Sequence, residues 1–318
     1  MNNIEKANKV FLENFPADTN FERAVFFSWY CGIRDCKYCY MSTQPENKMA
    51  KRTDASILAE IILCKRLGWD IGFISGGQKA YSHHDFLELL KKINAVLGDK
   101  VWINIGSLKK EELAAFKPYI KGVVGAIECV NPKLHDELCP SKPVAPFVEM
   151  FKRCDELGLK KGMTLIVGLG ETIDDFPLLE KFIKDNGISK IHIYGLNPQK
   201  GTIFENTKPP KPEYHAEWIA RTRIAFPKID IQAGIWTDKV KSISLLLKAG
   251  ANSLSKFPAI RQFNSAAAKE IERQAKLAGR SFKGTMTKLP EIRISGFSPE
   301  IQKQLKLYIR QLSKHRHP

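Results

Sequence analysis

Three cysteines lie within nine residues near the start of the chain, and they constrain the protein more than any other feature of its sequence. The segment reads Tyr30-Cys31-Gly32-Ile33-Arg34-Asp35-Cys36-Lys37-Tyr38-Cys39, so the thiols have C-x4-C-x2-C spacing. Three thiolates on one short loop can hold three irons of a cubane cluster, and the fourth iron then lacks a protein ligand. Because such an iron can bind a small molecule, the spacing predicts a catalytic metal centre.

Zinc is the main alternative for the three cysteines, because a C-x2-C pair with a third cysteine nearby also suits a tetrahedral site. A structural zinc needs a fourth ligand, and the twenty residues after Cys39 contain no histidine or cysteine. The nearest are Cys64, His83 and His84. A third alternative is that the thiols bind nothing.

Apolar, β-rich runs alternate with longer amphipathic stretches along the chain, which is the pattern of repeated βα units. Eight runs are expected to be strands: residues 24–29, 71–75, 101–105, 122–128, 163–167, 190–194, 229–235 and 251–254. Between them, helices are expected over residues 54–67, 85–97, 144–157, 173–186, 212–225 and 239–249. The fold class predicted is therefore α/β, a (βα)8 barrel of the TIM type.

The domain organisation follows from the same pattern. We expect a polar leader over residues 1–22, the barrel over residues 23–262 and a small helical extension over residues 263–318. The stretch 198–212 contains four prolines and is expected to be a long loop after the sixth strand. The cysteines directly follow the first strand, which places them at the carboxyl-terminal mouth of the barrel.

The composition of the chain indicates the compartment in which the protein works and the kinds of partner it could bind. We find no signal peptide and no run of about 18 apolar residues, so we expect a cytoplasmic protein without a membrane partner. Seven cysteines, three of them clustered, suit metal ligation better than a disulfide framework. The net charge of +16 favours an anionic partner, either nucleic acid or an acidic carrier protein, although a basic solvated surface explains it equally well.

The cysteine triad after strand one, with an aromatic residue before the third cysteine and a barrel behind it, resembles the radical S-adenosylmethionine (SAM) superfamily. The spacing departs by one inserted residue from the commonest pattern of the family, C-x3-C-x2-C. The resemblance implies a [4Fe-4S] cluster on Cys31, Cys36 and Cys39 whose open iron binds SAM. It also implies reductive cleavage of SAM to a 5′-deoxyadenosyl radical that abstracts hydrogen from an unactivated C–H bond. Tyr38 is then expected to lie against the adenine.

Further motifs strengthen the resemblance. Ser75-Gly76-Gly77-Gln78 ends the second strand where the family has a Gly-Gly-Glu motif, and Glu128 ends the fourth strand where related barrels place an acid that contacts SAM. Taken alone, the first is an ordinary glycine-rich turn and the second a surface acid. The resemblance assigns SAM binding to Tyr38, Ser75, Gly76, Gly77, Gln78, Asn104, Glu128, Gly168 and Tyr194.

The segment Ile166-Val167-Gly168-Leu169-Gly170-Glu171-Thr172 is similar to the fifth-strand motif of biotin synthase, HydE-type maturases and methylornithine synthase. The chain departs from biotin synthase where that family holds its sulfur-donating cluster. Gly162 stands where a cysteine is expected, and the seventh strand offers Gly234-Ile235-Trp236 instead of an arginine. Biotin synthesis by that mechanism is therefore not expected.

The sequence indicates the superfamily more clearly than it indicates the reaction. Cys129, Cys139 and Cys154 are candidate ligands of a second Fe-S cluster, or else ordinary buried thiols. With such a cluster, the chain resembles one component of the archaeal two-protein lipoyl synthase, which inserts sulfur into an octanoyl chain on an acidic carrier domain. That hypothesis implies a second radical SAM subunit and an electron donor such as ferredoxin or flavodoxin.

Two other functions remain open on the sequence. One is a radical rearrangement or cofactor-maturation reaction of the methylornithine synthase or HydE type, which needs a single cluster. The other is a basic, metal-containing nucleic-acid-binding protein, which would bind with a steep salt dependence but would not cleave SAM. Lys256 and Arg261, after the eighth strand, are candidates to bind a carboxylate or a carrier protein.

Overall fold

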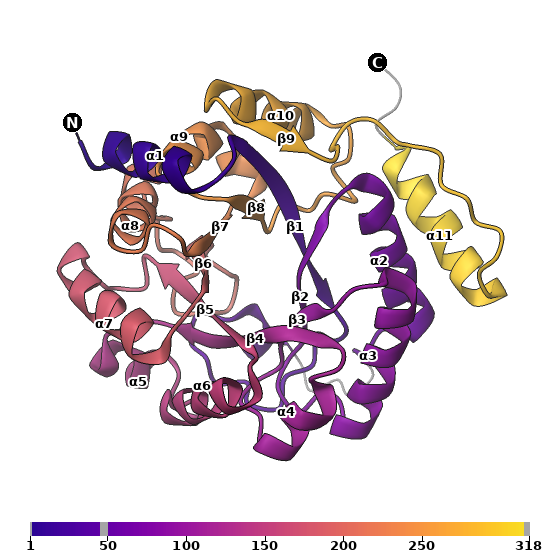
Figure 1. The fold of residues 1–318 in the computed structure, drawn as a ribbon, viewed down its shortest axis with the longest axis horizontal. Coiled ribbons are helices and arrows are strands. Elements are labelled where there is room, and N and C mark those ends of the chain that lie inside the picture. The colour runs from indigo at the N-terminus through magenta and orange to yellow at the C-terminus, as the bar shows by residue number, and fades with distance from the viewer. Residues whose placement is uncertain (1, 45–49, 315–318) are drawn as a thin grey trace.

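A computed structural model describes residues 2–44 and 50–314 of the chain. Its centre is a ring of parallel strands, seen end-on in Figure 1. The ring strands are β1 (Asp18–Phe26), β2 (Asp70–Ser75), β3 (Val101–Asn104), β4 (Ile120–Glu128), β5 (Lys160–Val167), β6 (Lys190–Gly195), β7 (Asp230–Gly234) and β8 (Ser253–Ser255). Because β1 pairs with both β2 and β8, the sheet closes on itself. The predicted barrel is confirmed, since every expected strand run overlaps one of these strands.

Helices cover the outside of the ring (Figure 1). They are α1 (Asn3–Asn14), α2 (Asp54–Leu67), α3 (His83–Leu97), α4 (Lys110–Phe116), α5 (Pro132–Leu138), α6 (Ala145–Leu157), α7 (Phe176–Asn186), α8 (Pro212–Ala225), α9 (Ile243–Lys248), α10 (Ala266–Leu277) and α11 (Pro299–Leu312), with short 3-10 segments η1 (Tyr40–Ser42), η2 (Ile173–Asp175) and η3 (Thr237–Ser242). Outward strand residues such as Ile191 and Ile193 are buried in the main apolar core. α2 and α8 have the bounds expected from the sequence.

The first strand begins earlier than its sequence predicts. We expected it over residues 24–29, after a leader of residues 1–22, but β1 begins at Asp18 and α1 packs against α8 and α9. The reason is that β1 carries polar residues on its inner face: Glu22 accepts a hydrogen bond from Lys190 inside the barrel, and Asn20 donates to the exposed Asp70. A strand with a polar inner face lacks the apolar run that marks a buried strand, so the boundary placed at residue 23 falls within β1.

The C-terminal part of the chain packs onto the barrel at two places. α10 packs against α9, and α11 packs against α2. A short strand, β9 (Ser281–Lys283), pairs with the start of β1 outside the closed ring and was not expected. α10 and α11 lie near the two ends of the predicted helical extension, residues 263–318, whose last residues, 315–318, lie outside the described residues.

A buried ionic network occupies the amino-terminal end of the barrel interior. The Lys190 ammonium lies 2.8 Å from the Glu22 carboxylate and 2.6 Å from that of Asp230. Since β7 and β8 separate β6 from β1 in the sheet, the contact with Glu22 crosses the interior. Gln232 and Ser253 donate to the same carboxylate at 2.6 and 2.7 Å. Burial works against ionisation, but Lys190 and these hydrogen bonds hold the pKa of Glu22 below its ordinary value.

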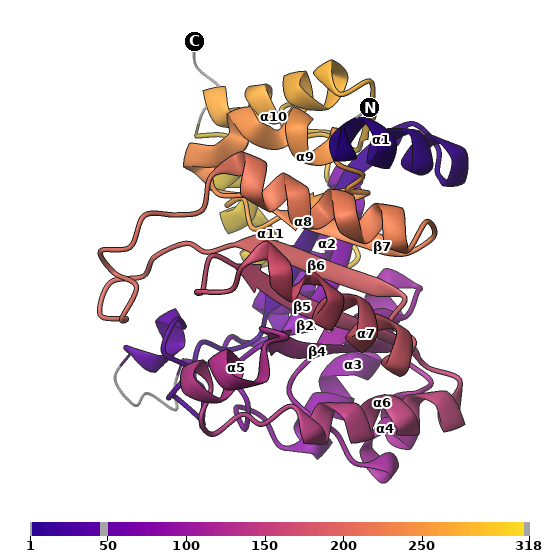
Figure 2. The ribbon, with the colours of Figure 1, turned by 90° about the vertical axis from the view of Figure 1, so that its left-hand side faces the viewer.

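The opposite end of the barrel carries the long connections. Figure 2 shows α5 and the loop between β6 and α8 projecting on one side of the ring. The loop contains the prolines expected there, and its Gly201 lies against Thr43 of the segment that follows the cysteines. No helix within the described parts of the chain has the length and apolar character needed to cross a membrane.

Candidate active site

The predicted cysteine ligands lie on the loop that follows β1. Cys31, Cys36 and Cys39 are free thiols, and each is partly buried. The Gly32 N–H donates to the Gln78 carbonyl at 2.8 Å, which ties the loop to the end of β2. Within residues 2–44 and 50–314, no three His, Cys, Asp or Glu side chains are drawn together as a metal-binding group.

Two glycines allow the cysteine loop to lie directly on the end of β2. A Cβ atom on Gly77 would lie 1.9 Å from the Tyr30 carbonyl oxygen and 2.5 Å from the Cys31 Cα atom. A Cβ atom on Gly76 would lie 2.3 Å from the Phe27 ring. This close seat, together with three thiols as the donor set, fits a cubane iron–sulfur cluster.

Two lysines flank the thiols. Lys142 is 6% exposed, lies 3.9 Å from the Glu128 carboxylate and donates to the Tyr38 hydroxyl oxygen at 3.1 Å. Burial works against its charge, but Glu128 and the nearby thiols raise the pKa of Lys142. The ammonium of Lys256 lies over the Tyr194 ring, 4.4 Å from its centroid. Burial raises the pKa of Cys39 to about 11, and the pKa of Cys36 is raised as well. The charge of Lys142 acts in the opposite direction on Cys36 and favours the ionised form that binds iron.

A fourth thiol lies beside the triad. Cys139, which follows α5, lies in a small apolar cluster against which Cys36 packs, and its S–H donates to the Tyr38 oxygen at 3.6 Å. Cys129 belongs to the same small apolar cluster. Cys154 instead lies on α6 in the main core, so only two of the three candidate auxiliary ligands are brought together. The sequence did not reveal the contact between Cys139 and Cys36.

The predicted SAM-binding residues on β2, β3 and β4 gather at the mouth of the barrel. The Ser75 hydroxyl donates to the Asn104 carbonyl at 3.0 Å. Gln78 lies so close to Gly106 that a Cβ atom there would be 2.9 Å from its side-chain Cδ. Glu128 ends β4 with a φ of 64°, a left-handed conformation that is costly for a residue with a side chain. Such strain is concentrated at functional sites, which supports a role for Glu128.

In the motif that follows the fifth strand, the side chain of Glu171 folds back and accepts hydrogen bonds from the backbone of the same turn. The Gly168 and Leu169 N–H groups donate to the Glu171 carboxylate at 2.6 and 2.8 Å, and the Tyr214 hydroxyl lies 3.0 Å from it. Burial raises the pKa of Glu171. Thr172 accepts a hydrogen bond at the start of η2, as expected for a capping residue. The contacts of Glu171 are thus with the turn that contains Gly168.

A row of polar side chains lines one wall of the barrel interior beneath the cysteines. Lys190, His192 and Tyr194 alternate along β6, and His192 and Tyr194 both contact Gln232 of β7, at 2.8 and 3.2 Å. Of these residues, only Tyr194 was predicted to belong to the site. The signal for the others is a polar residue at every second position of a strand expected to be buried on both faces.

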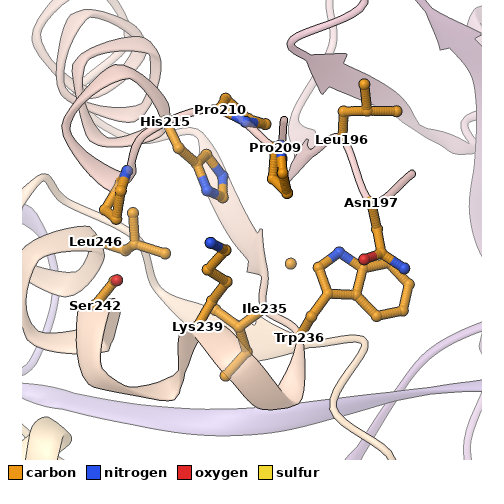
Figure 3. Close-up of a pocket in the computed structure, with 13 residues that line it drawn as sticks. Leu196, Asn197, Pro209, Pro210, His215, Ile235, Trp236, Lys239, Ser242 and Leu246 are labelled. Atoms are coloured by element: carbon orange, nitrogen blue, oxygen red, sulfur yellow. The ribbon is translucent and has the colours of Figure 1, made fainter. Parts of the chain in front are cut away.

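A separate pocket lies between the ends of β6 and β7 and the helices α8 and α9 (Figure 3). It encloses about 440 Å³, including its opening to solvent. His215 and Lys239 point into it, and burial lowers the pKa of His215 to about 4, which keeps this ring neutral. None of the predicted site residues, all of which the structure describes, lines this pocket.

Replacing Gly77 with alanine should prevent cluster assembly without unfolding the barrel. The new Cβ atom would collide with the Tyr30 carbonyl and with Cys31, so the cysteine loop would have to leave the end of β2. We expect iron binding after anaerobic reconstitution to fall at least about tenfold, measured beside the far-UV circular dichroism spectrum.

The matched control is Gly279→Ala, at a glycine beyond α10 that has open space around its Cβ position but a φ of 72°, so alanine strains the backbone there without a collision. This variant should bind as much iron as the unmodified protein. Equal iron binding by Gly77→Ala would show that the loop does not need its close seat on β2.

Comparisons with known proteins agree with this geometry. The family model described as "Radical SAM superfamily" matches residues 30–183. An uncharacterized protein of Methanocaldococcus jannaschii is 38% identical over 293 residues, covering 90% of this chain and 81% of that protein. A biotin synthase of Thermotoga neapolitana is 23% identical over 265 residues, covering 78% and 87%. The solved structure of methylornithine synthase shares the fold, with a TM-score of 0.74, 21% identity and 88% of each chain covered.

Proposed function

The chain belongs to the radical SAM superfamily, in its biotin-synthase-like branch, and we propose that it abstracts hydrogen from a small polar molecule bound inside the barrel. The reaction class would be a radical rearrangement or maturation reaction, which needs one cluster.

The chain offers ligands for both cofactors of such a reaction. When bound, a [4Fe-4S] cluster and SAM supply a 5′-deoxyadenosyl radical that takes a hydrogen atom from a C–H bond. Cys31, Cys36 and Cys39 would hold the cluster. By the family resemblance, Gly77 and Glu128 would contact SAM, and both lie at the mouth of the barrel beside the cysteine loop or Lys142.

The observation that carries the substrate proposal is the polar wall of the interior. His192, Tyr194 and Gln232 lie directly above the ion pair of Lys190 and Glu22. Burying a polar group without a hydrogen-bonding partner costs on the order of 1–3 kcal/mol in proteins. His192, Tyr194 and Gln232 hydrogen-bond to one another, but His192 Nε2 has no partner among the described residues. A bound eight-carbon octanoyl chain would leave this nitrogen without a partner, whereas a polar molecule can donate to it.

Sulfur insertion into a carrier-bound octanoyl chain is the second candidate, and a specific observation favours it. Cys129 and Cys139 lie in one apolar cluster with Cys36, where they could contribute to a second iron–sulfur site. The net charge of +16 also suits an acidic carrier domain. Cys154 would not take part, because it lies in the main core. This candidate keeps the second radical SAM subunit as a partner, and both candidates need an electron donor such as ferredoxin or flavodoxin.

Counting iron and sulfide after anaerobic reconstitution separates the two candidates. We expect about four irons per chain in the unmodified protein and the same number in a Cys129→Ala/Cys139→Ala variant, because these thiols hold no cluster in a single-cluster enzyme. About eight irons, falling to about four in that variant, would contradict the single-cluster proposal and establish sulfur insertion as the better one. A Cys64→Ala/Cys154→Ala variant, in which both thiols come from the buried core, controls for lost stability.

A further inference from the structure

His192 has a fixed proton position, which follows from a chain of hydrogen bonds that begins at Glu22. The ionised Glu22 carboxylate can only accept, so the Gln232 side-chain nitrogen, 2.6 Å away, donates to it. The Gln232 oxygen must then accept from His192 Nδ1 at 2.8 Å and from the Tyr194 hydroxyl at 3.2 Å. His192 therefore carries a proton on Nδ1.

The other nitrogen of His192 is a buried acceptor without a partner. His192 is fully buried, and burial lowers its pKa to about 3, so the ring is neutral and its Nε2 atom bears no proton. Among the residues that the structure describes, nothing donates to Nε2. Leaving a buried acceptor unsatisfied costs free energy, which favours a ligand whose hydroxyl or amino group donates to Nε2. Because Nε2 is closed off from solvent, such a ligand reaches it only when a neighbouring side chain such as Phe73 moves aside.

Lys256 supplies a cation above the same wall. Its ammonium lies 4.4 Å from the centroid of the Tyr194 ring, and the two rings of Tyr194 and His192 lie 6.2 Å apart. Lys256 has a φ of 68°, a strained conformation at the end of β8. Burial lowers the pKa of Lys256, and the carboxylate of Glu128, which also lies 3.9 Å from the Lys142 ammonium, offsets this effect only in part. No carboxylate among the described residues lies within ion-pair distance of Lys256, so a ligand carboxylate can supply a direct partner.

The facing wall of the barrel is apolar. A Cβ atom on Gly125 would lie 2.6 Å from the Phe151 ring of α6, so Gly125 faces outward and its neighbours Val124 and Ala126 face the interior. The Phe73 ring lies 5.0 Å from the His192 ring. Ala126 is partly exposed, which shows that solvent reaches the interior at this level. A carbon chain can lie against this wall while polar groups face His192 and Lys256.

We propose that the substrate combines an anionic group, bound by Lys256, with a hydroxyl or amino group that donates to His192 Nε2. The proposal rests on the proposed function, whose substrate it specifies. A monocarboxylic acid with a hydroxyl or amino group farther along its carbon chain has this chemistry. Neither group touches the reacting C–H bond, so Lys256 and His192 act as specificity-determining residues.

The test uses reconstituted, SAM-loaded enzyme and three matched probes: 6-hydroxyhexanoate, hexanoate and hexan-1-ol. We expect 6-hydroxyhexanoate, or a homologue between 4-hydroxybutanoate and 8-hydroxyoctanoate, to bind about tenfold or more tightly than the matched acid and alcohol in equilibrium dialysis. Lys256→Met should weaken its binding about tenfold to a hundredfold, and Lys256→Arg should restore much of it. His192→Phe should remove the advantage of the hydroxy acid over hexanoate.

The control is Lys239→Met, which removes the same charge from the separate pocket of Figure 3 and should leave probe binding unchanged. Equal binding of all probes, no binding by any member of the series, or loss of binding in Lys239→Met would overturn the proposal. So would a loss of SAM binding in Lys256→Met, because the cation would then serve SAM. The 5′-deoxyadenosine formed by the same samples without probe reports separately on the proposed function: its absence from the unmodified enzyme would refute that function.

Discussion

Substituting alanine for Cys31 or Cys39 should leave a folded protein that no longer binds a cluster. Each substitution removes one of three thiolates, and two cannot hold a cubane with one open iron. We expect iron per reconstituted chain to fall from about four to below about one, and reductive cleavage of SAM to fall to the background. The measurement is iron and sulfide content beside circular dichroism.

Cys36 needs a different design, because Cys139 lies beside it and can replace it as a ligand. A Cys36→Ala/Cys139→Ala variant should lose the cluster completely, whereas Cys36→Ala alone can retain part of it. Cys154→Ala is the matched control, since this thiol lies in the main core and should not affect iron binding. Full iron binding by Cys39→Ala, or its loss in Cys154→Ala, would contradict the assigned ligands.

Replacing Lys190 with methionine should destabilise the barrel more than any surface substitution. The change leaves Glu22 buried without its cation, and also removes the contact with Asp230. Breaking a buried ion pair by removing one partner costs about 3–5 kcal/mol, and we expect the free energy of unfolding to fall by that amount. Urea denaturation of the cluster-free protein measures it.

Two further variants test whether the loss of stability in Lys190→Met comes from the buried ion pair. Lys181→Met removes an exposed ion pair with Asp185 and should change the free energy of unfolding by less than about 1 kcal/mol. Glu22→Gln/Lys190→Met removes both charges and should cost less than Lys190→Met alone. If Lys190→Met were as stable as the Lys181 variant, the network would not support the barrel.

The ionic network of Glu22 and Lys190 should also make the stability of the protein depend on pH. The pKa of Glu22 is lower in the folded chain than its ordinary value of 4.5, so its contribution to stability is present above that pH and is lost as the pH falls below it. Denaturation at pH 3 and pH 6 should therefore differ less in Glu22→Gln than in the unmodified protein.

The barrel and its helices were predictable because the outward strand residues are apolar and the helices carry ordinary capping signals. Ile191 and Ile193, for example, lie in the core beneath the helices, as their pattern indicated. The start of β1 was not predictable in this way, because Glu22 belongs to a polar interior. A strand whose inner face binds ions looks like a polar leader in the sequence.

The site was predictable only where its residues follow one another in the chain. The Cys31 loop and Gly77 could be placed at neighbouring strand ends, and the structure brings them into contact. The contact of Cys139 with the triad and the acceptor atom of His192 depend on pairings between distant strands and loops. The left-handed φ of Glu128 likewise depends on tertiary packing, so no local sequence pattern predicted it.

Radical SAM chemistry is tested most directly by the formation of 5′-deoxyadenosine from SAM by the anaerobically reconstituted protein, with dithionite as the reductant. We expect 5′-deoxyadenosine from the unmodified protein and none from a Cys31→Ala/Cys36→Ala/Cys39→Ala variant. A reconstituted protein that holds about four irons but forms no 5′-deoxyadenosine, or a triple variant that still forms it, would show that the three cysteines do not support this reaction.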